Sequence, residues 1–136
     1  ELGVHHTFDY AFVPHTGDWK QAKVYRSGME FNQPLMVRKT SHHAGTLPQR
    51  RSLYTVSADN VVLTAVLSVP VGTLVRLYEA EGREHTSVSL QSHFPILSAE
   101  ETNLLGAEGI TLPIENDSLH FNIGAFEIKT FLLRHS

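Results

Sequence analysis

The stretch Thr86-Ser87-Val88-Ser89-Leu90-Gln91 decides the fold class of this chain. Thr86, Val88 and Leu90 alternate with polar residues, and successive side chains of a β-strand point to opposite faces of a sheet. The stretch therefore predicts a strand with one face in the core and the other in water. The same pattern recurs twice further along the chain, at Ile110, Leu112 and Ile114 and at Leu119, Phe121 and Ile123. Short strands of this kind, joined by turns, predict an antiparallel β-sandwich.

Apolar and β-branched segments predict further strands on both sides of that stretch. They lie at residues 52–56, 61–69, 74–80 and 126–133, and the last has apolar residues on both parities, which predicts burial on both faces. Asp59-Asn60 and Asn116-Asp117-Ser118 predict turns, and residues 81–85, which include Gly82, predict a hairpin connection. Residues 100–105 fit either a helical turn or a short strand.

The first third of the chain predicts one more strand, a turn and a short helix. Five residues of one parity would project to the same face of that strand, namely Val4, His6, Phe8, Tyr10 and Phe12. Pro14-His15-Thr16-Gly17 predicts the turn, and Asp18 with Gln21 resembles a capping box that begins a helix over about residues 18–31. Residues 38–51 are polar and predict a surface loop. The predicted architecture is mainly β, an antiparallel β-sandwich with one short helix near the N-terminus.

Length and composition restrict the class of protein. The 136 residues, 41% of them hydrophobic, suit a single domain over residues 1–136. The net charge is -3 with scattered basic residues, so nucleic acid is not an expected partner. The apolar run from Val61 to Val71 is too short to cross a bilayer, so no membrane partner is expected either. Because the chain begins at Glu1 and not at a methionine, we expect a fragment or processed product of a longer parent.

The absence of cysteine excludes disulfides and thiolate chemistry, and it suits a reducing compartment. We therefore expect a cytoplasmic protein. Nine histidines raise the question of a metal site. His5-His6 and His42-His43 are adjacent pairs, whose side chains point to opposite faces in a strand, and no third ligand is identifiable beside His15 and Asp18. The sequence thus predicts no metal ligand in this chain.

Paired carboxylates, roughly 5 to 10 Å apart, are the groups that glycoside hydrolysis requires. Three candidate pairs lie in turns or at strand ends, where exposed charge is the usual finding: Glu100 with Glu101, Glu79 with Glu81, and Glu115 with Asp117. The sequence contains no Gly-x-Ser-x-Gly elbow and no glycine-rich phosphate loop. These observations predict no catalytic residue.

The corner formed by His15, Asp18 and Trp19 is the best candidate for a substrate-binding site. Trp19 is the one tryptophan of the chain, and sugar sites commonly place an aromatic face against a pyranose with polar neighbours on its hydroxyls. The alternative is that Trp19 anchors the helix by packing under the Phe8-Tyr10-Phe12 face. The spacing fits both interpretations equally well.

Three stretches, in order, carry a resemblance that covers nearly the whole chain. They are FDYAFVPHTGDW at residues 8–19 followed by FNQPL at 31–35, LVRLYEAEG at 74–82, and AFEIKTF at 125–131. Together they resemble the C-terminal part of the family 38 glycoside hydrolases, the α-mannosidases. The first stretch is the most specific, while the other two contribute through their order and spacing.

The resemblance implies a longer parent whose N-terminal α/β catalytic domain holds zinc, an aspartate nucleophile and an acid carboxylate, and cleaves α-mannosides with retention of configuration. None of the family's zinc or nucleophile motifs matches residues 1–136. We therefore expect a non-catalytic C-terminal domain without a cofactor of its own. It would pack an apolar face against the catalytic domain, and its His15–Trp19 corner would lie at the edge of the cleft that binds the α-mannoside.

Two other functions stay open at this point. One is a free-standing carbohydrate-binding or adaptor module that shares only the sandwich architecture, because a fold does not fix a function. The other is a small independent hydrolase that uses Asp9, Asp18 and His15, although no supporting residues are evident around them.

Overall fold

The computed structural model describes residues 3–135, apart from the side chain of Thr86. Contacts within the chain divide it into two compact units, residues 1–44 and residues 45–136. The single domain expected for residues 1–136 stays a prediction. The helix of the described residues is nine residues long, well short of what a bilayer span requires.

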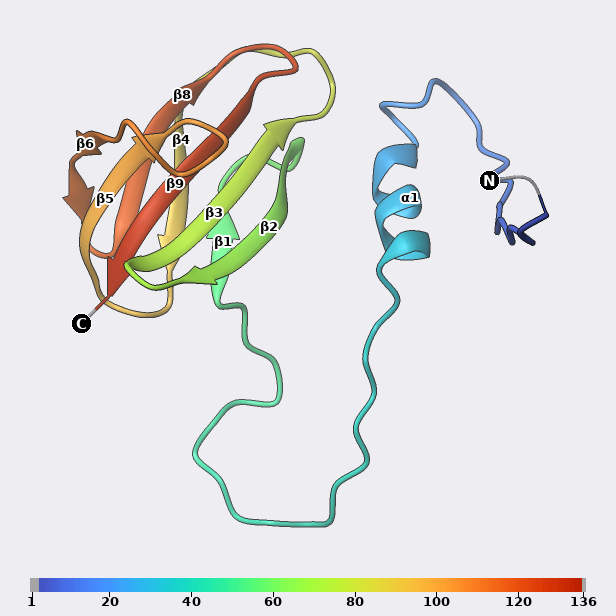
Figure 1. Cartoon of the computed structure of the whole chain (residues 1–136), viewed down its shortest axis with the longest axis horizontal. Helices are drawn as coiled ribbons and strands as arrows, with labels where there is room; N and C mark the ends of the chain where they lie inside the picture. The colour runs from blue at the N-terminus through green and yellow to red at the C-terminus, as the bar shows by residue number, and fades with distance from the viewer. Residues whose placement is uncertain (1–2, 136) are drawn as a thin grey trace. The chain divides into compact units, whose positions relative to one another are not determined.

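The second unit is an antiparallel β-sandwich, as predicted, built from two sheets (Figure 1). The four-stranded sheet has the order β1-β4-β8-β7, and the five-stranded sheet has the order β2-β3-β9-β5-β6. The strands are β1 Tyr54–Val56, β2 Val61–Val69, β3 Gly72–Glu79, β4 His85–Ser92, β5 Ile96–Thr102, β6 Ile110–Leu112, β7 Ile114–Glu115, β8 Ser118–Ile123 and β9 Ile128–His135.

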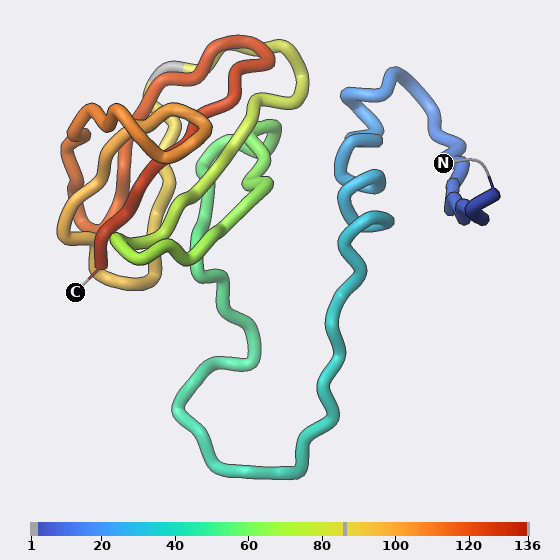
Figure 2. The backbone as a smooth tube through the Cα atoms, viewed as in Figure 1, coloured from blue at the N-terminus to red at the C-terminus, as the bar shows by residue number. Residues whose placement is uncertain are grey.

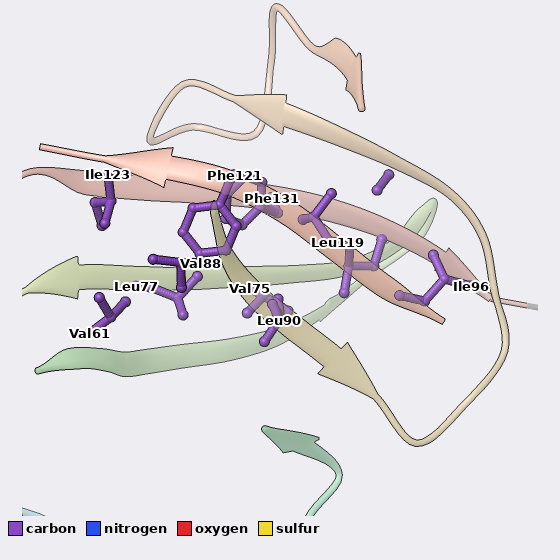
Figure 3. Close-up of a cluster of buried hydrophobic side chains, with 12 residues drawn as sticks. Val61, Val75, Leu77, Val88, Leu90, Ile96, Leu119, Phe121, Ile123 and Phe131 are labelled. Atoms are coloured by element: carbon purple, nitrogen blue, oxygen red, sulfur yellow. The ribbon is translucent and has the colours of Figure 1, made fainter. Parts of the chain in front are cut away.

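The core lies between the two sheets, where side chains from both layers point toward one another (Figure 3). The predicted alternation is confirmed on β4, where Val88 and Leu90 are buried, and on β8, where Leu119, Phe121 and Ile123 are buried. At the centre of this core, the ring centroids of Phe121 and Phe131 are 4.8 Å apart. The predicted pattern does not hold throughout β6, because Ile110 at the sheet edge is 69% exposed.

Strand β9 lies between β3 and β5, so the backbone groups on both of its edges are paired. Residues 130–133 are all buried, as their mixed parity predicts. The predicted burial is wrong at the start of the segment, because Phe126 precedes β9 and is 62% exposed and Ile128 is 53% exposed. Pairing with β9 also decides the conformation of residues 100–105, for which the sequence fits either a helical turn or a short strand. Glu100, Glu101 and Thr102 pair with β9 as the end of β5, and the chain turns after them.

The turn predicted at Asn116-Asp117-Ser118 is confirmed. Asn116 and Asp117, with φ of 51° and 58°, connect β7 to β8 in the left-handed conformation that two-residue hairpins require. Pro70-Val71 connects β2 to β3. The predicted hairpin at residues 81–85 is wrong, because β3 and β4 belong to different sheets and the segment crosses between them (Figure 2). The neighbours of β3 are β2 and β9, so no edge of β3 is left for β4.

The first unit contains α1, Val24–Asn32, which begins later than predicted. Oδ1 of Asp18 accepts hydrogen bonds from the backbone N–H groups of Lys20 and Gln21 over 2.9 and 2.8 Å, as a cap would. These bonds stabilise a separate turn and not the helix. Lys23, with a left-handed φ of 49°, separates that turn from α1, which begins at Val24. The predicted irregular segment at residues 38–51 is confirmed.

The predicted strand near the N-terminus is wrong. None of residues 4–13 lies in a strand, and Phe8, Tyr10 and Phe12 are 82%, 81% and 86% exposed. Residues two positions apart are close only through their rings. The ring centroids of His6 and Phe8 are 6.3 Å apart, and those of Tyr10 and Phe12 are 5.8 Å apart. A strand forms only where a neighbour satisfies its backbone groups, and residues 3–44 include no other strand to provide that neighbour.

Candidate functional site

The predicted corner begins with a tight turn that holds His15 at the surface. Gly17 has a φ of 74°, a conformation that side chains rarely adopt, and the Gln21 side chain occupies the space where a Cβ would stand. Only glycine therefore fits this turn without rearrangement. The turn forms an open hollow lined by Pro14, His15, Thr16, Gly17, Gln21 and Ala22.

Asp18 and Trp19 lie beside this hollow and do not line it. One carboxylate oxygen of Asp18 is committed to the turn through its two backbone hydrogen bonds. Trp19 is 42% exposed, and the Lys20 ammonium lies 5.4 Å from its ring centroid. The structure thus brings His15 and Gln21 to one surface and leaves the Trp19 side chain partly exposed next to it.

The alternative role for Trp19, a core anchor under the aromatic face, does not match its surroundings. Phe8, Tyr10 and Phe12 each remain more than four-fifths exposed, so they form no buried layer. Phe8, Asp9 and Tyr10 instead line a second open hollow with Thr7, Phe31 and Asn32. Because Asp9 and His15 line different hollows, the geometry does not support a hydrolase that combines Asp9, Asp18 and His15.

Glu79 is the most buried carboxylate of the sandwich, and its environment contradicts the exposed rim expected for the Glu79–Glu81 pair. Glu79 is 0% and Glu81 3% exposed. Oε1 of Glu79 accepts hydrogen bonds from Asn60 Nδ2 at 2.7 Å and the Glu81 N–H at 2.8 Å. Oε2 accepts from the N–H groups of Gly82 at 2.6 Å and Phe126 at 2.9 Å.

These hydrogen bonds decide the charge state of Glu79. Burial by itself raises the pKa of a carboxyl group, but the backbone donors outweigh it and hold the pKa of Glu79 below its ordinary value. The ionised carboxylate joins the end of β3 to the segment before β9, since Phe126 belongs to the latter. Its role is structural, and sequence alone gave no sign of the segments that cover it.

The other candidate carboxylates also have structural partners. Oε1 of Glu100 lies 2.5 Å from Nη1 of Arg134, on the adjacent strand. Oδ1 of Asp117 accepts a hydrogen bond from the Ile96 N–H at 3.0 Å, which ties the β7–β8 turn to the start of β5. Adjacent residues Glu100 and Glu101 point to opposite faces of β5, so they do not form an acid–base pair.

A hollow between the two sheets is the polar site that sequence reasoning missed. Its lining residues come from five strands and are Ser87, Glu101, Leu112, His120, Phe121, Asn122 and Lys129. The Lys129 side chain is 12% exposed, and its ammonium lies 2.5 Å from Oε1 of Glu101 and 3.3 Å from Oε1 of Glu127. Burial opposes the charge of Lys129, but the two carboxylates prevail and raise its pKa. Only strand register brings these residues together, so the sequence offered no local signal for them.

Among residues 3–135 no group of three or more His, Cys, Asp or Glu side chains is placed to hold a metal ion. The described residues therefore offer no set of ligands for the zinc that the family resemblance implies for a catalytic domain.

Comparisons with known proteins agree with this architecture. The family model described as "Glycosyl hydrolases family 38 C-terminal beta sandwich domain" matches residues 60–131, a range that runs from the start of β2 into β9. Alpha-mannosidase 2C1 of Mus musculus is 30% identical over 136 residues, and that of Homo sapiens is 27% identical over 135 residues. Both alignments cover 94% of this chain and 13% of the relative, so the chain spans about 13% of the length of these relatives. No solved structure matches the chain significantly.

Proposed function

This chain belongs to glycosyl hydrolase family 38, whose C-terminal β-sandwich domain it carries, and from that premise we propose that it is a non-catalytic part of an α-mannosidase-like enzyme. The match between the family model and the strands from β2 onward carries the proposal. In the parent enzyme, hydrolysis of α-mannosides with retention would be the task of a separate N-terminal catalytic domain that holds the zinc.

The contacts of the carboxylates in the sandwich support a non-catalytic role for this chain. Glu79, Glu100, Glu101 and Asp117 are all engaged in hydrogen bonds or ion pairs that connect strands or turns. A hydrolytic pair requires two carboxyl groups that face a common sugar, roughly 5 to 10 Å apart. Side chains that already hold the sandwich together are poorly placed for that task.

Exposed apolar residues of the first unit support packing against the catalytic domain. Leu35, Met36 and Val37 are 95%, 100% and 93% exposed, in addition to the aromatic residues Phe8 and Tyr10. Runs of exposed apolar side chains are typical of surfaces that another protein or domain covers. We infer that this surface contacts the catalytic domain of the same polypeptide.

The corner at His15 and Trp19 is proposed to lie at the edge of the active-site cleft. The half-exposed indole of Trp19 offers a face for the apolar side of a pyranose, and the hollow beside it offers His15 and Gln21 as hydrogen-bonding groups. In this proposal Asp18 fixes the turn that presents both groups. The α-mannoside would thus reach this chain only as bound by the parent.

Two assays on the 136-residue chain test the proposal. We expect no turnover of an aryl α-mannoside with zinc present, and turnover would overturn the non-catalytic role. We also expect no heat of binding when mannose or mannan is titrated into the chain. Measurable binding by the isolated chain would instead favour the free-standing carbohydrate-binding module.

A cytoplasmic location is proposed from the lack of cysteine in the sequence. Fractionation of cells that express the longer protein, followed by detection of this segment, tests it. Recovery in a secretory compartment would contradict the proposal.

A further inference from the structure

The described sheets have one long edge strand, which pairs with a neighbour on one side only. Three of the four edge strands in the described sheets are short, since β1 and β6 have three residues and β7 has two. The fourth, β2, has nine residues and lies outside β3 at the margin of the five-stranded sheet (Figure 1). A long edge strand presents a row of unpaired backbone groups that can pair with another chain segment.

The sequence of β2 lacks the residues that usually prevent such pairing. Natural edge strands are usually guarded by charged residues, proline or bulges. VVLTAVLSV contains neither a charged residue nor a proline, and its bulge lies between Leu63 and Ala65. Beyond the bulge the register is regular, from Ala65 opposite Arg76 to Val69 opposite Gly72.

Exposure is concentrated in this regular half of the strand. Val66 pairs with Val75, which is fully buried, so Val66 lies on the core face at its margin. Leu67, one residue on, lies on the outer face. Val66 is 44% and Leu67 50% exposed, whereas Val61 at the other end of β2 is 4% exposed. Both faces of the sheet are therefore incomplete beside residues 65–69.

We propose that residues 65–69 of β2 pair with an extended segment supplied by another part of the longer polypeptide, which adds a strand to the five-stranded sheet. A five-residue segment, roughly 17 Å long, would satisfy the free backbone groups and cover both Val66 and Leu67. Because the edge carries no charge, the segment should be uncharged and rich in β-branched or aromatic residues. This inference rests on the proposed function, in which the chain is part of a longer α-mannosidase-like enzyme.

Chain length favours a covalently connected occupant over a second copy. The chain covers 13% of the relatives that it matches, so most of such a polypeptide lies outside it. A segment of the same polypeptide is present at a high effective concentration, which a second molecule lacks. Strand addition in this form needs no oligomer.

Amide hydrogen exchange, compared between the 136-residue chain and the longer protein that contains it, tests the proposal. Alternate amides of residues 65–69 do not face β3, and in the isolated chain we expect them to exchange freely. In the longer protein we expect the same amides to exchange at least about tenfold more slowly. Val66→Lys should restore fast exchange there, whereas Leu97→Lys, at a 67% exposed position on the interior strand β5, should not.

Each outcome decides the point. Fast exchange at these amides in the longer protein would overturn the proposal, with no variant needed. Protection that appears in the isolated chain and grows with its concentration would identify a second copy as the occupant and overturn the proposal of a segment from the same polypeptide. If the longer protein had no α-mannosidase activity, that result would contradict the proposed function, whatever the exchange rates of the β2 amides.

Discussion

The side-chain amide of Asn60 donates a hydrogen bond to Oε1 of Glu79 over 2.7 Å, and both residues are buried. Asn60 immediately precedes β2 and Glu79 ends β3, so the bond joins these two strands at the end of the hairpin opposite the Pro70-Val71 turn. The same carboxylate holds the backbone before β9 through Phe126. One buried charge thereby fixes the positions of three segments that are distant in sequence.

Glu79→Gln is expected to destabilise the sandwich by about 2–4 kcal/mol, because an amide N–H₂ would replace an oxygen that now accepts from backbone donors. Urea unfolding of the 136-residue chain measures this change. Glu115→Gln, at an exposed position on β7, is the matched control and should change stability by less than about 0.5 kcal/mol. Equal effects of the two substitutions would contradict the structural role of Glu79.

Stability is expected to fall as the pH drops below about 4.5, the ordinary value for a glutamate. The pKa values of Glu79 and Glu127 are both lowered in the folded protein, so the unfolded state binds more protons at acid pH. Their contribution is present above the unfolded-state pKa and is lost as the pH falls through the folded-state pKa. Urea midpoints between pH 7 and pH 3 test this, and a midpoint that stays constant would contradict it.

Phe131→Ala should destabilise the chain by about 3–5 kcal/mol, because Phe131 is fully buried and packs against Phe121 in the centre of the core. Phe8→Ala removes the same ring from an 82% exposed position and should have little effect on the isolated chain. Thermal unfolding of both variants compares the two positions. A loss at Phe8 as large as that at Phe131 would show that the first unit has a core that this structure lacks.

Gly72→Ala is expected to destabilise the β2–β3 hairpin by about 2 kcal/mol or more. Gly72 has a φ of 150°, and a Cβ there would collide with the carbonyl oxygen of Leu133 on β9. Gly45→Ala serves as the control, because a Cβ at residue 45 meets open space. Chemical unfolding of the two variants should separate them clearly, and indistinguishable midpoints would refute the close approach at Gly72.

Trp19→Ala in the longer protein should raise the KM for an aryl α-mannoside by roughly three- to tenfold, with kcat and the unfolding temperature nearly unchanged. Loss of an aromatic face that contacts only the sugar weakens binding without altering the reacting groups. Phe94→Ala, at a position of similar exposure in the sandwich, is the control. An unchanged KM in the Trp19 variant would count against a role at the cleft.

Sequence reasoning succeeded where local chemistry decides the structure. The bounds of β2 at residues 61–69 and the turn at Asn116-Asp117 match the prediction, because β-branched residues and left-handed turn residues act locally. It failed at residues 81–85, where Gly82 suggested a hairpin but the strands on either side join different sheets. The five residues of this connection do not determine whether the strands before and after it pair with each other.

The candidate site was predictable only in part. The turn at Pro14–Gly17 and the binding of backbone amides by Asp18 follow from residue type, and the structure contains both. The ion pair between Lys129 and Glu101, in the hollow between the sheets, joins residues 28 positions apart and has no sequence signal. The His15, Asp18 and Trp19 corner stays a prediction that the proposed kinetics must test.

The sequence by itself determined which side chains of each strand share a face, since the backbone geometry of a strand fixes that alternation within a few residues. Val88, Leu90 and Phe121 are buried as their parity requires. Only the tertiary structure decided that Glu79 is buried and that residues 4–13 form no strand. Burial and strand pairing depend on partners far away in the chain: Glu79 finds donors at Asn60 and Phe126, whereas residues 3–44 provide no neighbouring strand for the aromatic segment.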